Sequence, residues 1–489
     1  MGRLITLNNS DIDKKLILLL VSFLSVLILS GCVASSDFTE GTAEITESAQ
    51  EQLFPDYVYD QEKAQSQAGE HYAVSEEGYY YIANSILYFY DISDGNAFPL
   101  CTKASCMHTD QKCNAYIYDY TDERPDWVTN SVYEKIYYYN GHLYMISQKW
   151  DGNSFLYQYD KDFTNQKEIG QIAWGTETPR VLFQDIRSSV IHNGFLYYLT
   201  FEMAEDWLHS ELRDVPYTLR RIRLEEKSES EELYTFEFPI DYDILTASYV
   251  GFRILTSGDD VYCISAIQSR QFETNDRVQQ RVIRYRESEG AELLWTYAGD
   301  EKVNLFGCAG EGPFWAYFSA LNMKGELTFL TEAGNEAMSP KSLTTVNLLT
   351  KESRLLYRTP YDSIGRFLTD GNNYYFTEYE PGHMYLTAID QEGNLIRRYE
   401  FEYTDSYMES MEKQGIPREQ WGGAVGVLLL DSRYIAVSCG EYGGVYKGLT
   451  HKGKYDYSES AEIRDTDAIG LILTEDFLDG KDVEIQQIY

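Results

Sequence analysis

Four residues with metal-binding side chains lie close together in the sequence, in the spacing C-x4-C-x-H-x4-C. They are Cys101, Cys106, His108 and Cys113. Three thiolates and one imidazole form a tetrahedral set of the kind that holds zinc in structural sites. Outside the cytosol the same thiols would instead form a disulfide, Cys101–Cys106 or Cys106–Cys113, with one thiol left single or paired to a distant cysteine. Reduced or redox-active thiols are a third alternative.

We interpret this cluster as structural, because four protein ligands leave no metal position open for water. Its H-x4-C half resembles a zinc knuckle, although that family spaces its first two cysteines as C-x2-C. The other cysteines of the folded part, Cys263, Cys308 and Cys439, are predicted to lie on or beside strands as small buried apolar residues.

The seventh cysteine, Cys32, follows a segment that could direct export. Basic residues precede an apolar run over residues 16–29, and Ser30 and Gly31 separate this run from Cys32. A basic start, a short apolar core and small residues before a cleavage point are typical of a secretory signal peptide. The run of about 14 residues is shorter than the roughly 20 that a membrane-spanning helix needs.

The sequence Leu29-Ser30-Gly31-Cys32 resembles the lipobox of bacterial lipoprotein precursors. The resemblance implies a diacylglyceryl group on the Cys32 sulfur, cleavage before Cys32, and acylation of the new N-terminus, for example with palmitate. We therefore expect a lipid anchor in the cell membrane, on its extracytoplasmic face. The alternative is an uncleaved N-terminal anchor with an incidental cysteine.

The segment after Cys32 has the composition of a tether. Small, polar and acidic residues dominate residues 33–55, and such a segment buries too little apolar surface to become ordered. The predicted organisation is a signal peptide over residues 1–31, a lipidated cysteine with a flexible acidic tether over residues 32–55, and a folded domain over residues 56–489.

The charge of the chain argues against a nucleic-acid partner. Asp and Glu number 78 against 41 Lys and Arg, so the formal net charge is −37. Phosphate backbones require clusters of basic residues, and the sequence contains no dense basic run. The same charge disfavours adsorption to anionic lipid headgroups.

A turn followed by an aromatic-rich strand recurs seven times, at spacings of roughly 53 to 65 residues. The two-residue turns are Glu77-Gly78, Asn140-Gly141, Asn193-Gly194, Asp259-Asp260, Gly312-Pro313, Asp370-Gly371 and Asp431-Ser432. Asn-Gly and Asp-Gly pairs before alternating apolar residues are strong hairpin indicators. A third and a fourth strand follow each aromatic strand, so the repeat contains four short antiparallel strands.

A four-stranded unit repeated about seven times predicts an all-β fold, a β-propeller of seven four-stranded blades. Six or eight blades are alternatives, since Ala468–Leu473 has the pattern of a further inner strand. A pair of β-sandwiches or a β-solenoid is the competing architecture. Val483-Glu484-Ile485 is a candidate to pair with N-terminal strands and so close the ring.

Two segments interrupt the repeat and are predicted to form short helices, residues 202–216 and residues 406–420. In the second, Ser406 and Glu409 have the spacing of a capping box, and Gly415 would end the helix. Insertions of this kind lie on one rim of a repeat protein.

The segment around the cluster also resembles a known group of proteins. Leu100-Cys101, Cys106-x-His108 and Cys113-x-Ala115 resemble a segment of uncharacterised β-propeller lipoproteins from Gram-positive, largely clostridial bacteria. The resemblance extends over nearly all of residues 70–489. It implies an extracytoplasmic propeller and no known activity.

No short catalytic motif accompanies the repeat. G-x-S-x-G, H-E-x-x-H and Asp-box sequences are absent, and the seven histidines are scattered. We therefore expect no catalytic residues, no cofactor except zinc, and a protein that is not an enzyme. The favoured function is a binding or scaffolding module for a protein, peptide or glycan. The alternatives are an accessory or sensor subunit of a surface transport or signalling system, and an extracytoplasmic hydrolase or lyase acting on polysaccharide or peptide.

Overall fold

The structure is a computed structural model that describes seventeen parts of the chain. They are residues 72–83, 86–108, 113–117, 132–148, 153–175, 180–183, 189–203, 217–236, 249–268, 278–299, 319–322, 324–332, 340–421, 425–431, 433–439, 445–449 and 468–488. Residues 1–50 form one unit of the chain and residues 51–489 a second, which holds every described element. Cys32, the tether, both predicted domain boundaries, Cys308 and residues 204–216 lie outside the described parts. Within those parts, no helix combines the length and the apolar character that crossing a membrane requires.

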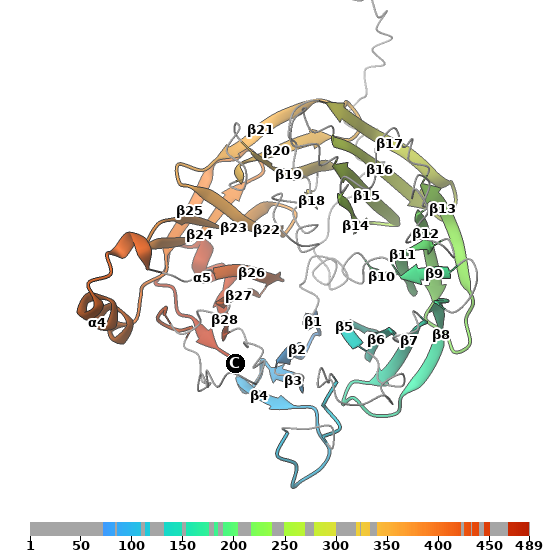
Figure 1. The fold of residues 1–489 in the computed structure, drawn as a ribbon, viewed down its shortest axis with the longest axis horizontal. Coiled ribbons are helices and arrows are strands. Elements are labelled where there is room, and N and C mark those ends of the chain that lie inside the picture. Colours follow the sequence, from blue (N-terminus) through green and yellow to red (C-terminus); the bar gives the residue numbers. More distant parts are fainter. Residues whose placement is uncertain are drawn as a thin grey trace, which may run out of the picture. The chain divides into compact units, whose positions relative to one another are not determined.

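The described strands form seven antiparallel sheets, and each sheet contains four strands that follow one another in the sequence. Figure 1 shows the sheets arranged radially around a common centre, with the first strand of each sheet innermost. This arrangement is a seven-bladed β-propeller. It confirms the predicted fold and settles the blade number at seven.

The first four blades occupy residues 72–299. Blade 1 consists of β1 (Tyr72–Val74), β2 (Gly78–Ala83), β3 (Ile86–Asp91) and β4 (Asn96–Pro99). Blade 2 consists of β5 (Val132–Tyr139), β6 (His142–Gln148), β7 (Ser154–Asp160) and β8 (Lys167–Ala173). Blade 3 consists of β10 (Val190–His192), β11 (Phe195–Met203), β12 (Tyr217–Arg223) and β13 (Ser230–Phe236), and β9 (Arg180–Phe183) pairs with β11 as an extra strand. Blade 4 consists of β14 (Tyr249–Ser257), β15 (Asp260–Gln268), β16 (Val278–Arg286) and β17 (Gly290–Gly299).

The last three blades occupy residues 319–487. Blade 5 consists of β18 (Ser319–Leu321), β19 (Glu326–Glu332), β20 (Pro340–Asn347) and β21 (Ser353–Arg358). Blade 6 consists of β22 (Ser363–Thr369), β23 (Asn373–Glu380), β24 (His383–Asp390) and β25 (Leu395–Glu400). Blade 7 consists of β26 (Val425–Leu430), β27 (Tyr434–Cys439), β28 (Ala468–Leu473) and β29 (Gln486–Gln487). Ala468–Leu473 is thus the third strand of blade 7 and begins no further blade.

The Asn-Gly hairpins form where the sequence predicts them. Asn140 and Gly141 between β5 and β6 have φ angles of 47° and 79°, and Asn193 and Gly194 between β10 and β11 have 48° and 79°. Two consecutive left-handed residues match the twist of the flanking strands, which is why Asn-Gly is favoured there.

The predicted turn of blade 5 is wrong. Gly312-Pro313 lies outside the described residues, and the hairpin forms later, between β18 and β19. There the Asn322 side-chain oxygen accepts the backbone N–H groups of Lys324 at 2.9 Å and Glu326 at 3.0 Å. Gly325 takes the left-handed conformation that this turn needs, with φ 71°.

The outer strands of blades 2 to 6 share a β-bulge at corresponding positions. The bulged residues are Ile169, Leu233, Leu294, Leu356 and Ile396. A bulge sets two consecutive residues against one partner and breaks the alternation of side chains. In blade 4 it allows Leu294 and Trp295 to be buried together while Leu293 is exposed.

The apolar core lies between blades. The described buried side chains form seven clusters, and each cluster draws its members from two neighbouring blades. The cluster that closes the ring packs Val74 and Tyr81 of blade 1 against Leu429 and Ile469 of blade 7. The expected pairing of Val483-Glu484-Ile485 with N-terminal strands is wrong, because these residues form no strand and Val483 and Ile485 pack against the core between blades 6 and 7. The strand that follows them, β29, pairs with β28 of its own blade.

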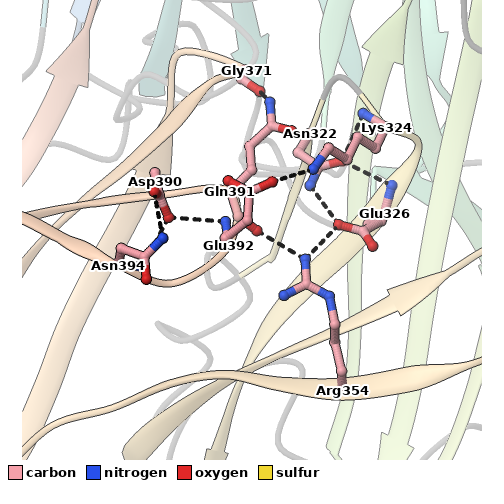
Figure 2. A network of polar contacts seen from close by, with 9 residues as sticks. All are labelled: Asn322, Lys324, Glu326, Arg354, Gly371, Asp390, Gln391, Glu392 and Asn394. Carbon is pink, nitrogen blue, oxygen red and sulfur yellow. Dashed lines mark hydrogen bonds and ion pairs between the residues drawn. The ribbon is translucent and has the colours of Figure 1, made fainter.

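Polar side chains also connect neighbouring blades. Figure 2 shows Arg354 of β21 between two blades, donating to Glu326 Oε2 at 3.0 Å and to the carbonyl oxygen of Gln391 at 2.8 Å. The Gln391 side chain in turn donates to the Gly371 carbonyl oxygen at 2.6 Å. Blades 5 and 6 are therefore joined by hydrogen bonds as well as by their apolar cluster.

The predicted second helix is present as α4 (Asp405–Gln414), followed by the short helix η4 (Arg418–Gln420). Its N-cap is Thr404 and not Ser406, since the Thr404 side chain accepts the N–H of Tyr407. Gly415 ends the helix at φ 68°, as predicted. A further short helix, α5 (Thr474–Leu478), follows β28.

Candidate metal centre

The four residues of the predicted cluster lie in the connection that leaves blade 1 after β4, which extends outward from the ring in Figure 1. We call Cys101, Cys106, His108 and Cys113 the Cys3His cluster. The sequence places it in an outer loop after the fourth strand of the first repeat, and the structure confirms this position.

The structure brings all four side chains of the Cys3His cluster together. One ligand atom from each residue lies within 4.8 Å of the other three, and His108 Nδ1 is 3.3 Å from Cys113 Sγ. Zinc with bonds of about 2.3 Å to sulfur and about 2.0 Å to nitrogen separates its donors by roughly 3.5 to 3.8 Å. The donor atoms are thus gathered to within about 1 Å of tetrahedral spacing, and the group could hold a metal ion.

Tight turns position these ligands. The N–H of Cys101 donates to the Pro99 carbonyl oxygen at 2.7 Å, and the N–H of Cys106 donates to the Lys103 carbonyl oxygen at 3.1 Å. His108 has a left-handed backbone with φ 53°, a conformation that non-glycine residues adopt only rarely.

The cluster is partly shielded from solvent by the core between blades 1 and 2. Cys113 is buried, while Cys101, Cys106 and His108 are half-buried. Leu100, on the adjoining backbone, belongs to the same apolar group as Cys113. This setting suits a structural ion, which is held away from substrate and bulk water.

The protonation of the thiols reflects the crowding of sulfur atoms. Burial would raise the pKa of Cys101, but hydrogen bonds from the N–H groups of Lys103 and Asn114 outweigh it and lower the pKa to about 7. Burial, together with the neighbouring Cys101 and Cys106, raises the pKa of Cys113 to about 12. Backbone N–H groups that donate to sulfur favour the thiolate, which is the form that binds a metal.

None of the described cysteines is in a disulfide. They are Cys101, Cys106, Cys113, Cys263 and Cys439. Cys263 is buried in the core between blades 3 and 4, and Cys439 in the core between blades 6 and 7. As the sequence predicts, both are small buried residues, and both lie in cores other than that of the Cys3His cluster.

Three buried carboxylates are functional candidates that sequence reasoning did not single out. Asp260, Glu378 and Asp431 are at most 6% exposed, and they pair with Arg286, Arg398 and Arg433 at 2.6 to 2.8 Å. They belong to blades 4, 6 and 7, and each is paired within its own blade. No local motif marks Asp260 or Glu378, because each depends on an arginine of a later strand that the fold brings beside it. Asp431 and Arg433 are only two positions apart in the sequence.

Comparison with known proteins identifies no family. No family model matches the chain, and no curated protein matches it. Solved structures do match the chain. Three of them are puromycin hydrolase (12% identity, TM-score 0.43), a prolyl endopeptidase (11%, 0.44) and a polysaccharide lyase that is an ulvan lyase (10%, 0.41).

The matched regions cover 86%, 90% and 89% of this chain, respectively. They cover 61% of puromycin hydrolase, 54% of the prolyl endopeptidase and 94% of the lyase, so the chain spans little more than half of either peptidase. At this level of identity the likeness is one of fold.

These findings contradict the expectation that the chain is not an enzyme, and that expectation is withdrawn. It depended on the absence of short catalytic motifs, and the solved structures that match this chain include peptidases and a polysaccharide lyase. In a propeller, side chains from several blades can meet at one site without being close in sequence. A missing motif therefore says nothing about activity, and a fold by itself assigns none.

Proposed function

We propose that this chain is a lipid-anchored bacterial protein, on the extracytoplasmic face of the cell membrane, whose propeller binds another protein. The lipobox-like sequence ending at Cys32 supports the anchor, and the acidic composition of residues 33–55 supports a tether between lipid and propeller. Its cofactor is a zinc ion held by the Cys3His cluster as a structural group.

The observation that carries the binding role is a set of exposed apolar side chains on outer strands. Eight large apolar side chains are exposed in the described residues, and five of them lie on β4, β17, β21 and β25. These five, the outer-strand apolar set, are Phe98, Leu293, Leu355, Leu395 and Ile396. Four of the five lie on the outer strands of blades 4, 5 and 6, which pack against one another in turn, and exposed apolar side chains that form a contiguous patch mark sites of protein association.

The chemistry of this set favours a protein over a glycan. Four of its five members are aliphatic, and the central part of a protein–protein interface is apolar. An accessory or sensor subunit of a surface transport or signalling complex would use the same surface, because it also needs a protein partner. A peptide or a glycan is the alternative ligand.

The anchor is tested by expression in a bacterial host with radiolabelled palmitate. The wild-type chain should take up label and stay with the membrane fraction, whereas Cys32→Ala should be unlabelled. Equal labelling of the two proteins would contradict the lipid anchor.

The binding role is tested by crosslinking on intact cells with a double variant, Leu355→Glu with Leu395→Glu. The matched control is Leu473→Glu, which changes an exposed leucine at the end of β28. A genuine partner should be captured by wild type and control and lost in the double variant, with equal thermal stability of all three. A partner captured equally by all three would contradict this surface, and capture of glycan alone would contradict a protein partner.

A further inference from the structure

We infer that the Cys3His cluster binds one Zn²⁺ in a closed tetrahedral site, and that the ion fastens the connection between blades 1 and 2 to the outer edge of β3. The inference rests on the zinc cofactor of the proposed function, but it does not depend on the anchor or on the partner. Two lines of observation carry it, the ligand set and the backbone pairing beside it.

The ligand set selects the class of metal. Ca²⁺ and Mg²⁺ take oxygen ligands, and the donors here are three sulfurs and one imidazole nitrogen. Thiolates combined with imidazole in a tetrahedron are the ligands of structural zinc. Because all four positions would be filled by protein, the site has no place for a substrate or a reactive water.

The backbone beside the cluster shows what the ion would hold. β4 ends at Pro99, opposite Tyr88 of β3, so the remaining edge of β3 needs another partner. Residues 115–117 supply it, since Tyr116 forms an antiparallel bridge with Ile86.

Leu87 is the point at which β3 changes partner. Its carbonyl oxygen accepts the N–H of Leu100 at 2.9 Å, and its own N–H donates to the carbonyl oxygen of Ala115 at 2.9 Å. Leu100 precedes the first ligand, Cys101, and Ala115 comes two residues after the last, Cys113. The two chain segments that pair with Leu87 are therefore the two that one ion would tie together.

The side chains of this connection complete the packing between blades. Ala115 and Ile117 are buried in the same cluster as Ile86 of blade 1 and Leu143 of blade 2. An ion at the Cys3His cluster thus fixes a stretch of chain that contributes to the first interblade core. Without it, residues 113–117 would be held by few hydrogen bonds at a sheet edge, which is where local opening is easiest.

The test combines metal analysis with hydrogen exchange on the whole purified protein. The variant is Cys106→Ser, and the matched control is Cys263→Ala, which removes a buried thiol from blade 4. We expect one zinc per chain in wild type and control, and a loss of zinc in Cys106→Ser. Removal of zinc from wild type with a chelator should speed exchange at the Leu87 amide about tenfold and leave the amide of Leu386, in blade 6, unchanged.

The possible outcomes test the zinc cofactor and the fastening role separately. Less than about half an equivalent of zinc, with the thiols oxidised to disulfide, would overturn both the zinc cofactor and the fastening role. A full equivalent of zinc whose removal leaves the Leu87 amide as protected as before would overturn the fastening role alone. The exchange comparison uses only the wild-type protein, with and without zinc. It therefore tests the fastening role even if Cys106→Ser does not fold.

Discussion

The phenol of Tyr79, on the second strand of blade 1, donates a 2.8 Å hydrogen bond to Asp431, at the end of the first strand of blade 7. Arg433 pairs with the same carboxylate and also donates to the carbonyl oxygens of Ser75 and Glu76. No described strand is shared between blades 1 and 7. Side-chain contacts between these two blades therefore close the ring.

Removing the Tyr79 hydroxyl should weaken this closure. Tyr79→Phe keeps the ring and its packing but takes one donor from a buried carboxylate, which costs about 1 to 3 kcal/mol. We expect a lower free energy of unfolding in urea by that amount. Tyr379→Phe, at a tyrosine that is 37% exposed, is the control and should have no effect beyond about 0.5 kcal/mol. Equal stability of the two variants would show that packing alone closes the ring.

A lysine should not replace Arg433. The guanidinium donates to two carbonyl oxygens and a carboxylate at once. The lysine side chain ends in a single ammonium nitrogen, which cannot keep all three contacts. Arg433→Lys should therefore lower the free energy of unfolding by about 1 to 3 kcal/mol, although the charge is kept. Arg223→Lys, at an arginine that is 57% exposed, should be neutral. A neutral Arg433→Lys would mean that only the charge matters at this position.

The sequence predicts the blades well where turn chemistry is local. Asn140-Gly141 and Asn193-Gly194 mark their hairpins because both residues accept a positive φ. The turn of blade 5 is predicted wrongly because two residues separate Asn322 from Gly325, so no Asn-Gly pair marks it. Glu326 follows, so the run of aromatic residues that marks the other turns is also missing. The bulge at Leu294 also cannot be predicted from the sequence. The pair Leu293-Leu294 gives no sign of whether the register between β16 and β17 shifts there.

For the Cys3His cluster, the spacing of the four residues predicts that their side chains lie together. It does not predict which part of the propeller a bound ion would hold in place. The change of partner at Leu87 depends on backbone N–H and C=O groups of residues far apart in sequence, and backbone groups carry no sequence signature. The capping of α4 was misplaced for a related reason. Ser406 and Thr404 are both good N-cap residues, and the N–H of Thr404 is bonded to the carbonyl oxygen of Val445, a contact that the sequence does not reveal.

A buried carboxylate in blade 6 should be essential to stability. Glu378 is fully buried and accepts hydrogen bonds from Thr359 and Thr387, both at 2.5 Å, from Tyr357 at 2.8 Å and from Arg398 at 2.8 Å. Glu378→Ala leaves the Arg398 charge without its partner, and breaking a pair of this kind costs about 3 to 5 kcal/mol. Glu378→Gln also removes the charge, but it keeps the volume of the side chain and a carbonyl oxygen that can accept from Arg398, so it should cost clearly less. Equal losses in urea unfolding would show that the lost charge, and not the cavity, accounts for the cost.

The buried tyrosines should make the propeller sensitive to alkali. Burial raises the pKa of Tyr217 from 10.0 to about 12, and burial likewise raises the pKa of Tyr198 and Tyr374. The unfolded chain releases these protons from about pH 10, while the folded chain keeps them. The stability that they confer is therefore complete below pH 10 and is lost as the pH rises through the folded pKa, by up to about 1.4 kcal/mol per pH unit for each tyrosine.

We expect the free energy of unfolding to be constant with respect to these groups up to about pH 9.5 and to fall steeply above pH 10. Phenolate absorbance of the buried tyrosines should appear together with the loss of far-ultraviolet circular dichroism. Tyr217→Phe removes one of these groups. The free energy of unfolding should then fall less steeply with pH, by up to about 1.4 kcal/mol per pH unit, which corresponds to one proton. If every tyrosine ionised near pH 10 while the dichroism stayed native, the phenols would have to be open to water, and the packing of the interblade cores described above would be wrong.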